Sequence, residues 1–403
     1  MKLIFWMSVS VVLYTFLVYP LVLVVLASLF QLSSDLRFAL GRGNRRGVPV
    51  PDPLVSMIIP AHNEAGIIAE KMRNCAELDY PKSRLEILVG CDGCTDDTVE
   101  RIRESCHSNV RIFDSAERSG KPAMLNRLVP EARGEILLFS DANTLYNPES
   151  VRSLVRRFAA PGVGAVCGEL KLLAPDGKTA TEGLYWRYEC FLKILESRLN
   201  MLVGANGAIF AIRRDLYRPL PAGTINDDFL IAMDIRRQGF SVVYDPEANA
   251  FEETSTVQQE FRRRIRIGSG DLRALRQTWT MLSPLAGSVA LSYWSHKICR
   301  WLVPLALITS FVSAVWLSRD VFYLGCALLG LLLVASAGFG YFLQVNERRP
   351  GVFGVPCHFL AMNLALLIGF AKDLFGSRTG VWAPTARIQK IERESSKADM
   401  ARV

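Results

Sequence analysis

The chain has apolar stretches at both ends and a mixed, polar middle. No charged residue occurs between Lys2 and Asp35, and three more uncharged stretches follow late in the sequence, at residues 301–318, 321–346 and 350–371. Each stretch is a candidate membrane helix, because a spanning helix needs about 20 mostly apolar residues. The middle is charged, turn-rich and large enough to bury a core of its own. These patterns exclude a purely soluble enzyme and a pure transporter.

The middle of the chain alternates short β-rich runs with helical patterns. This alternation predicts an α/β fold with a mostly parallel sheet, inserted between an N-terminal transmembrane helix and C-terminal transmembrane or interfacial helices. Ligands bind outside the carboxyl ends of the strands in such sheets. A helix is also expected after Asn147, with Pro148 at its first position. The other expected elements are strands at residues 55–59, 85–91, 110–113, 135–140 and 163–173, and helices at 64–77, 96–104, 181–201 and 258–277.

The distribution of charge predicts that the middle of the chain is cytoplasmic. Arg37, Arg42, Arg45 and Arg46 follow the first apolar stretch, and an excess of Lys and Arg beside a span marks its cytoplasmic side. The net charge of +8 fits attraction to anionic membrane lipids. Nucleic acid is not an expected partner, because the Arg clusters flank membrane segments and lack interleaved aromatic residues. The expected parts are an anchor at 1–36, a cytoplasmic domain at 37–257, amphipathic interfacial helices at 258–296, membrane helices at 297–375 and a basic tail at 376–403.

The last apolar stretch is a weaker span than the others. Residues 352–371 are interrupted by Pro356, His358 and Asn363, and there are glycines at 351, 354 and 369. The basic tail that follows favours the cytoplasmic side. We therefore expect this segment to be re-entrant or to lie in the interface, which leaves the tail close to the cytoplasmic domain.

Polar loops follow the first two expected strands. The first loop carries Pro60, His62 and Glu64, and the second carries Asp92. An acidic residue at a strand end can hydrogen-bond a ribose or a base edge while a divalent cation neutralises phosphate. An ordinary polar turn with a helix cap at Thr95 or Asp96 is the alternative interpretation of the second loop.

Two further loops contain groups suited to a cation and to phosphate. Asp141 and Asn143 follow a buried apolar strand, and their spacing puts both side chains on one side, where oxygen atoms of both can approach one hard cation. Gly120 and Lys121 open an expected helix, and phosphates favour helix N-termini beside a positive charge. The spacing of a Walker P-loop is absent.

Two charged clusters occur later in the middle of the chain. Asp227 and Asp228 are adjacent carboxylates that repel each other, so one is expected to have a raised pKa and to serve as a general base. The alternative is an ordinary acidic helix N-terminus. Residues 262–270 contain arginines that could bind a leaving diphosphate. A basic face against anionic lipid is the alternative for most of them, less so for Arg266.

Taken together and in this order, these elements resemble the membrane-embedded glycosyltransferases of family 2, the group that contains cellulose, chitin and hyaluronan synthases. The resemblance runs from about Leu54 to Arg387 and implies a nucleotide-sugar-binding domain of the GT-A type. It implies that Asp92 lies against the uridine of a UDP-sugar and that Asp228 is the catalytic base, and residues 382–387 resemble a tail motif that approaches the nucleotide. The residues implied for nucleotide-sugar binding are Pro60, His62, Glu64, Asp92, Lys121, Asp141, Asn206, Arg263, Arg266 and Arg387. Those implied on the acceptor side are Asn206, Gly207, Asp227 and Trp382, and those for the metal are Asp141 and Asn143.

Two motifs depart from the family pattern. Asn143 stands where the Asp-x-Asp motif has its second carboxylate, so Mg²⁺ or Mn²⁺ would be held chiefly by Asp141 and the diphosphate. In the Gln-x-x-Arg-Trp signature, Arg263 replaces Gln, Ile267 replaces Trp and only Arg266 is kept. Because this Trp stacks on the acceptor sugar in processive polymerases, its loss argues against processive synthesis.

We therefore expect an inverting glycosyltransferase that is an integral protein of the cell (inner) membrane with a cytoplasmic catalytic domain. Its expected partners are a nucleotide-sugar donor, a lipid or glycan acceptor and membrane lipids. A processive polysaccharide synthase is the alternative within the enzyme class. A catalytically silent membrane scaffold is the alternative of another class, and release of nucleoside diphosphate by the purified protein separates it from an enzyme.

Overall fold

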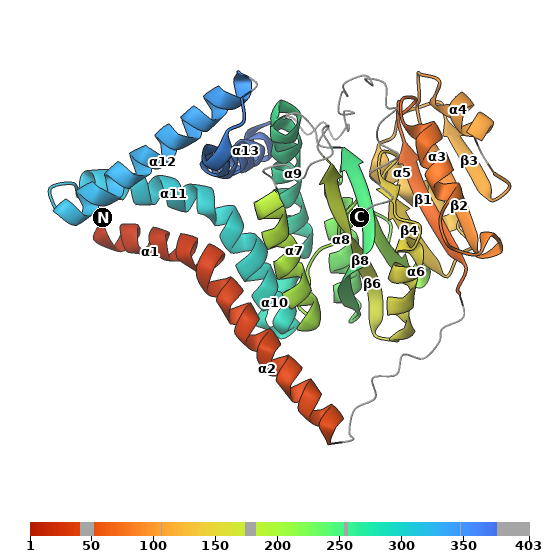
Figure 1. Cartoon of the computed structure of the whole chain (residues 1–403), viewed down its shortest axis with the longest axis horizontal. Helices are drawn as coiled ribbons and strands as arrows, with labels where there is room; N and C mark the ends of the chain where they lie inside the picture. The colour runs from red at the N-terminus through yellow and green to blue at the C-terminus, as the bar shows by residue number, and fades with distance from the viewer. Residues whose placement is uncertain (41–51, 106, 174–182, 254–256, 347, 377–403) are drawn as a thin grey trace.

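A computed structural model describes residues 1–403 except 41–51, 106, 174–182, 254–256, 347 and 377–403. The apolar helices of both chain ends lie on one side of the molecule and a sheet lies on the other (Figure 1). The described residues form an eight-stranded sheet in the order β3-β2-β1-β4-β7-β6-β8-β5. Its strands are β1 (Val55–Ala61), β2 (Leu85–Asp92), β3 (Val110–Ser115), β4 (Ile136–Ser140), β5 (Leu145–Tyr146), β6 (Val163–Leu173), β7 (Ile209–Arg213) and β8 (Ser241–Glu253).

The sheet is mixed, with parallel pairs in the majority. β3, β2, β1 and β4 are parallel neighbours, and β6 is parallel to β8. β7 runs antiparallel to β4 and β6, and β5 runs antiparallel to β8. The predicted α/β fold is confirmed, and every strand expected from the sequence is present. The sequence pattern did not indicate β5, β7 or β8.

Helices cover both faces of the sheet. They are α3 (Ile68–Ala76), α4 (Thr98–Ser105), α5 (Lys121–Leu128), α6 (Ser150–Arg156) and α8 (Asp227–Arg237). Alternate strand residues point to opposite faces, so Ile58 of β1 packs in one core cluster with α5 and α8. Its neighbours Met57 and Ile59 pack in a second cluster with α3, α4 and α6. β1 is therefore buried on both faces, which explains its largely apolar sequence, with Ser56 as its one polar residue.

Three helices begin later than the sequence pattern predicted. α3 begins at Ile68 rather than at residue 64, and α4 begins at Thr98 rather than at residue 96. α6 begins at Ser150 with Glu149 as its N-cap, so the prediction of Asn147 as the cap and Pro148 as the first helical residue is wrong. The physical reason is a turn, because the carbonyl of Asn147 accepts a hydrogen bond from the backbone N–H of Ser150.

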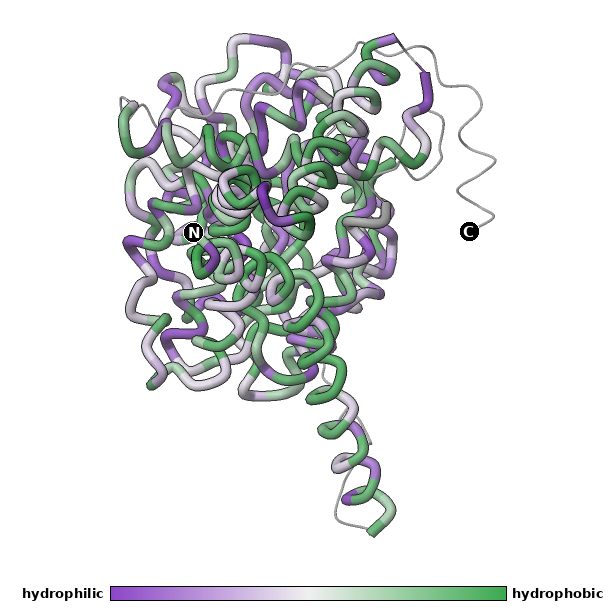
Figure 2. The backbone as a smooth tube through the Cα atoms, turned by 90° about the vertical axis from the view of Figure 1, so that its left-hand side faces the viewer, coloured by the Kyte–Doolittle hydropathy of each residue, from purple (hydrophilic) through white to green (hydrophobic). Residues whose placement is uncertain are grey.

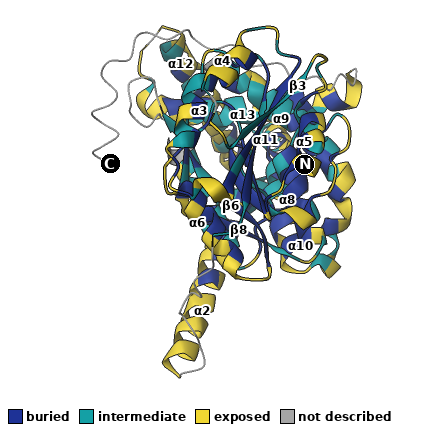
Figure 3. Ribbon diagram, turned by 90° about the vertical axis from the view of Figure 1, so that its right-hand side faces the viewer, coloured by how far each residue is buried: buried dark blue, intermediate teal, exposed yellow. Residues whose placement is uncertain are grey.

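Among the described residues, four helices are long and apolar enough to cross a membrane: Lys2–Ala39, Ser288–Trp316, Val321–Val345 and Gly351–Phe375. Their α-helical parts are α1 (Lys2–Leu13), α2 (Tyr19–Ala39), α10 (Ser288–Ser292), α11 (Cys299–Trp316), α12 (Val321–Val345) and α13 (Gly354–Phe375). α1 and α2 are joined by a π-helical segment, and so are α10 and α11. Hydrophobic residues predominate in these helices (Figure 2), and α2 projects from the molecule with most of its surface exposed (Figure 3).

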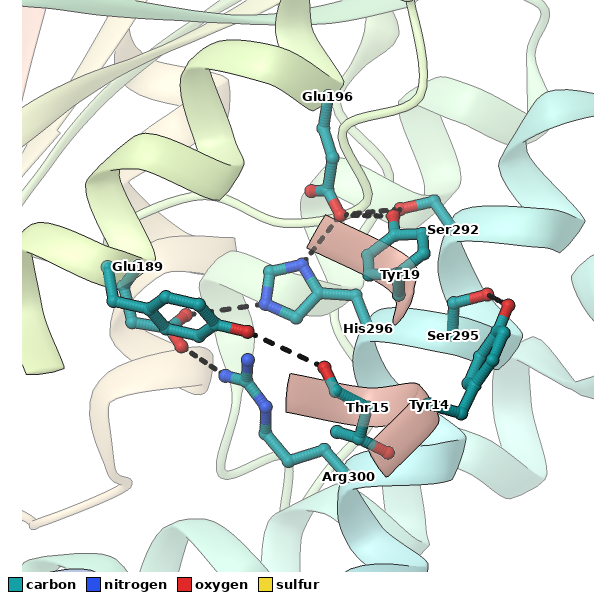
Figure 4. Close-up of polar contacts among 10 residues, drawn as sticks. Tyr14, Thr15, Tyr19, Glu189, Glu196, Ser292, Ser295, His296 and Arg300 are labelled. Carbon is teal, nitrogen blue, oxygen red and sulfur yellow. Dashed lines mark hydrogen bonds and ion pairs between the residues drawn. The ribbon is translucent and has the colours of Figure 1, made fainter. Parts of the chain in front are cut away.

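A buried polar cluster joins α2 to the rest of the molecule (Figure 4). At its centre is Glu196 of α7 (Gly183–Arg198), whose Oε1 accepts from the hydroxyls of Tyr19 at 2.6 Å and Ser292 at 3.0 Å. His296 Nδ1 lies 2.7 Å from the same oxygen. Burying a carboxylate is costly unless it is hydrogen-bonded. These three contacts therefore fix the junction between α2, α7 and the start of the α10–α11 helix, and we call the four residues the Glu196 cluster.

α13 lies along α9 (Val257–Thr278), the basic helix that the sequence pattern predicts. The two backbones touch at Gly369, where an added Cβ would lie 2.6 Å from the carbonyl oxygen of Ile265. Asp373 is buried and pairs with Arg273 at 2.7 Å and Arg276 at 2.8 Å. Gly369 of α13 meets Ile265 of α9, and the later residue Asp373 meets the later residue Arg273. The two helices are therefore parallel.

α13 is one unbroken helix, which accommodates the polar residues and the proline of this segment. Pro356 falls in the first turn, where proline is tolerated because its missing N–H has no intrahelical partner. Asn363 donates its amide to the carbonyl of Phe359 within the same helix. That this segment is re-entrant or lies in the interface stays a prediction.

Candidate active site

Lys121 connects two acidic elements at the carboxyl edge of the sheet. It is the first residue of α5, and the preceding Gly120 has a φ of +91°, a conformation that glycine adopts without strain. Its Nζ lies 2.9 Å from Asp141 Oδ1 and 3.2 Å from Asp227 Oδ2. Asp141 follows β4 and Asp227 opens α8, so the lysine joins elements far apart in the sequence.

The charges of this group influence one another strongly. Burial lowers the pKa of Lys121, but the carboxylates of Asp141 and Asp227 outweigh it and the pKa is raised, so the lysine stays charged. The pKa of Asp227 is raised by burial, with Lys121 opposing and Asp228 adding to the shift. The prediction that one of the adjacent carboxylates has a raised pKa therefore applies to Asp227, which is not the residue expected to act as the base.

Asp228 is oriented by backbone hydrogen bonds. Its Oδ2 accepts from the N–H of Gly207 and its Oδ1 from the N–H of Phe229, both at 2.8 Å. A Cβ at position 207 would lie 3.3 Å from Asp228 Oδ2, so only glycine leaves this approach uncrowded. Asn206 lies beside it, and its carbonyl accepts from Ile209 at the start of β7. The predicted base and the predicted acceptor-side loop are thus in direct contact.

Asp92 holds the loop that precedes Lys121. Its carboxylate accepts from the N–H of Ser119 at 2.7 Å, the hydroxyl of Ser119 at 2.9 Å and the N–H of Gly120 at 2.7 Å. His62 Nδ1 lies 2.6 Å from the carbonyl oxygen of Asp92. Asp92 and His62 therefore organise the end of β2 around the start of α5. The contact of Asp92 with a uridine stays a prediction.

The two remaining residues of the first loop lie at the end of β1 and beyond it. Pro60 pairs with Gly90 in the parallel register of β1 and β2. Glu64 donates its backbone N–H to Thr98 Oγ1 at 2.8 Å, next to the start of α4. Both are buried or half-buried near Asp92, and their role in nucleotide binding stays a prediction.

Asp141 and Asn143 have different partners. The amide nitrogen of Asn143 donates to Glu252 Oε1 of β8 at 2.7 Å, whereas Asp141 pairs with Lys121. The Asp141 side chain is 34% exposed and can take a further ligand. No group of three or more His, Cys, Asp or Glu residues that could hold a metal occurs in the described part of the chain. One carboxylate and one amide oxygen still fit Mg²⁺ or Mn²⁺, because such ions complete their shell with substrate phosphates and waters.

Arg266 approaches the acidic group from α9. Burial lowers the pKa of this guanidinium, the charge of Arg263 lowers it further, and Asp141 and Asp227 oppose the shift. Its Nε is buried and has no hydrogen-bond partner among the described residues. Arg263 itself lies 3.7 Å from Glu260. The other two predicted residues, Arg387 and Trp382, lie outside the described residues.

Sequence reasoning missed two buried residues around this site. Lys71 of α3 donates to Ser140 Oγ at 2.8 Å and to the carbonyl of Thr144 at 2.6 Å, so it braces the loop that carries Asp141. Asp271 of α9 accepts from the amide of Asn226, the N-cap of α8, at 2.8 Å. Asp271 is the one acidic residue between positions 261 and 276, a signal that could have singled it out.

The fold and this site define a GT-A type glycosyltransferase. Residues 51–270 match the family described as "Glycosyltransferase like family 2". The chain belongs to this family, so the predicted resemblance is confirmed, and the protein is a glycosyltransferase enzyme.

Several named proteins are similar to this chain. The chain is 27% identical over 237 residues to glycosyltransferase AglE of Haloferax volcanii, covering 57% of this chain and 75% of AglE. It is 23% identical over 355 residues to the beta-monoglucosyldiacylglycerol synthase of Synechocystis, covering 84% of this chain and 73% of that protein. The structure of the mannosyltransferase PcManGT from Pyrobaculum calidifontis, in complex with GDP-Man and Mn²⁺, superposes with a TM-score of 0.67 at 21% identity over 92% of this chain and 99% of PcManGT. This likeness confirms the GT-A fold.

Proposed function

We propose that this enzyme is a membrane-bound inverting glycosyltransferase that moves a sugar from a UDP-sugar to a lipid-linked or glycan acceptor. The observation that carries the proposal is the position of Asp228, which is fixed by two backbone N–H groups within the group formed by Lys121, Asp141 and Asp227. A carboxylate held in this way can remove a proton from an acceptor hydroxyl without moving. The proposed location is the cell (inner) membrane, with the catalytic domain in the cytoplasm.

The proposed reaction is a direct displacement. Asp228 takes the proton of the acceptor hydroxyl while that oxygen forms a bond to the anomeric carbon, on the face opposite the diphosphate. The bond from the anomeric carbon to the diphosphate breaks, and the nucleoside diphosphate leaves with the electron pair, so the stereocentre is inverted. Lys121 and Arg266 stabilise the negative charge that grows on the leaving group. Mg²⁺ or Mn²⁺, held by Asp141 and Asn143, would neutralise part of the same charge.

A lipid acceptor is favoured over a growing polysaccharide. One relative, which covers 84% of this chain, is named a beta-monoglucosyldiacylglycerol synthase, and a diacylglycerol is a lipid. Ile267 stands where processive members have their stacking Trp. The alternative of a polysaccharide synthase is supported by 22% identity over 284 residues to the poly-beta-1,6-N-acetyl-D-glucosamine synthase of Staphylococcus aureus, covering 67% of this chain and 64% of that protein.

The test is a donor screen on the purified full-length protein, read out by nucleoside diphosphate release and by mass analysis of lipid and polymer products. With the preferred donor, Asp228→Asn should lower turnover by about 10²–10⁴-fold, the usual contribution of a general base. Nucleotide affinity should stay within a few fold, because a base acts chiefly in the transition state. Asp234→Asn, on the same helix, is the control and should leave turnover unchanged. Unimpaired turnover in Asp228→Asn would remove this residue from the mechanism.

A further inference from the structure

A cavity of about 720 Å³ lies between α9, α11, α12 and α13, outside the site described above. Its volume is within the range of roughly 300–1,000 Å³ that is usual for ligand pockets. Most of its lining side chains are apolar, and they come from three of the helices that are apolar enough to span a membrane. Representative lining residues are Phe261, Pro304, Ala337, Gly338, Leu360 and Leu364.

The position of the cavity follows from the way α9 and α13 pack. The backbones of the two helices touch around Gly268 and Gly369, which leaves no space between them there. The cavity is lined by residues 258–262 of α9 and residues 357–367 of α13, so on α9 it lies wholly before the contact. It is therefore the space that opens where the two helices separate toward their N-terminal ends, closed on the far side by α11 and α12.

One rim of this apolar space carries a charge that has no ion-pair partner in the described part of the chain. Arg262 is exposed, and among the described residues no carboxylate pairs with it. Its neighbours differ, because Arg263 and Arg264 both pair with Glu260, at 3.7 Å and 2.6 Å. Gln258, one turn earlier on α9, adds a second exposed polar group to the same rim. An apolar cavity with a guanidinium at its rim is complementary to a molecule with an apolar chain and an anionic head.

The same helix leads from the cavity to the active site. Arg266 follows Arg262 by one turn of α9, about 6 Å along the helix axis. Arg266 is the residue whose guanidinium lies under the influence of Asp141 and Asp227. A head group bound at Arg262 would thus lie one helix turn from Arg266, while its chain occupies the cavity.

We propose that this cavity binds one acyl chain of an anionic glycerophospholipid, whose phosphate is held by Arg262. That this lipid position is also the position of the acceptor rests on the function proposed above. Diacylated lipids meet both requirements of the cavity, since they combine a flexible apolar chain with a compact charged group at one end.

The proposal is tested by photo-cross-linking with the full-length protein in lipid nanodiscs. The probe is phosphatidylglycerol with a diazirine in one acyl chain, and the adducts are mapped by mass spectrometry of peptides. In the unaltered chain, adducts should concentrate on the cavity-lining residues of α12 and α13. A map without adducts there would overturn the proposal, and this result needs no variant.

Two glycines of α12 provide a matched pair of variants. A Cβ at either Gly338 or Gly325 meets no atom within 4 Å, but only Gly338 lines the cavity. Gly338→Leu should lower capture of the probe on α12 and α13 at least fivefold, whereas Gly325→Leu should leave it unchanged. Equal capture by the two variants would overturn the proposal. Thermal unfolding of both proteins checks that each is folded.

Arg262→Gln tests the head group. It should lower capture of the phosphatidylglycerol probe severalfold and leave capture of a zwitterionic phosphatidylcholine probe unchanged. Equal loss for both probes, or no loss for either, would contradict the role of Arg262. Nucleoside diphosphate release in the same samples separates this inference from the proposed function: capture of lipid without any sugar transfer to lipid would support the cavity and contradict the lipid acceptor.

Discussion

The charges around Lys121 determine what the site can bind. Lys121 and Arg266 are positive, whereas Asp141, Asp227 and Asp228 are carboxyl groups that together can carry more negative charge than the two cations neutralise. A nucleoside diphosphate adds further negative charge. Additional positive charge is therefore needed for tight binding, and a divalent cation at Asp141 and Asn143 would supply it.

Removal of the cation should weaken nucleotide binding. We expect the unaltered protein to bind its nucleotide at least tenfold more tightly with Mn²⁺ than with EDTA, and Asp141→Ala to lose this difference. Isothermal titration of UDP, and of other nucleoside diphosphates, checks both statements. Asp215→Ala, an exposed acidic residue away from the site, is the control. Equal affinity in Mn²⁺ and EDTA for the unaltered protein would exclude the cation from nucleotide binding.

Asp271 should make stability depend on pH. Burial raises its pKa to about 7, with the charge of Lys297 opposing, from an unfolded value near 4. Because the folded state binds this proton more tightly, the stabilisation is complete below about pH 4 and is lost as pH rises through 7, a total of roughly 4 kcal/mol. Asp271→Asn keeps an acceptor for Asn226 and removes this loss. Its melting temperature should therefore rise relative to the unaltered protein between pH 5 and pH 8, and Asp215→Asn should show no such change.

Single residues show where reasoning from the sequence reached its limit. The loops that carry Asp92, Asp141 and Asp228 could be found because each follows a strand or opens a helix, and the topology brings such positions together. Lys71 could not be found, because a lysine on an amphipathic helix normally faces water, and only the tertiary fold buries this one under the Asp141 loop. The sequence also could not decide which of the adjacent carboxylates has the raised pKa, since burial decides it.

At the scale of helices and strands, buried parallel strands were easier to predict than the later ones. β1 and β2 are mostly apolar strands, each followed by a polar loop. β8 contains Asp245 and Pro246 in its middle, where its register with β6 shifts, and such a residue pair normally argues against a strand. β7 has only five residues, and its pairing with β4 and β6 depends on chain segments far away in the sequence. These strands are therefore a product of tertiary structure.

The contact between α9 and α13 should be sensitive to a single methyl group. In Gly369→Ala the new Cβ would lie 2.6 Å from the carbonyl oxygen of Ile265 and 2.9 Å from the N–H nitrogen of Ser269, and backbone atoms cannot turn aside. We expect a loss of about 1–3 kcal/mol, as for other overpacked positions. Gly325→Ala is the control, because it replaces a helical glycine that has open space around it and should be neutral or slightly stabilising. Thermal unfolding in detergent compares the two, and equal melting temperatures would contradict the tight contact.

At the scale of the whole molecule, the packing of α13 bears on the proposed topology. With the catalytic domain in the cytoplasm, α11 leads out of the cytoplasm and α12 leads back. α13 then runs parallel to the amphipathic α9 and is fixed to it through Asp373. α9 is expected to lie in the membrane interface, and a helix that runs alongside it fits that interface better than it fits a path across the membrane. We therefore propose that α13 lies in the interface and that the basic tail is cytoplasmic.

Cysteine labelling in intact cells tests this topology. A membrane-impermeant maleimide should label Arg319→Cys, in the connection between α11 and α12, and should leave Lys390→Cys, in the tail, unlabelled until the cells are opened. The unaltered chain, with its native cysteines, gives the background. Strong labelling of position 390 from outside would show that α13 crosses the membrane, and Arg387 could not then bind the nucleotide.

The Glu196 cluster has a consequence for the height at which the catalytic domain holds Asp228. The helix that begins as α10 contributes Tyr293 and Trp301 to the core of the catalytic domain and continues as a candidate span, and Glu196 locks α2 against it. With these helices in the bilayer, Asp228 would be held at a fixed height above the lipid surface. Displacement reactions tolerate misplacement of about 1 Å poorly. In the function proposed above, a lipid that has just received a sugar would carry its new hydroxyl groups higher than the one that reacted, above the level of Asp228, so the rigid mounting itself would end the reaction after one addition.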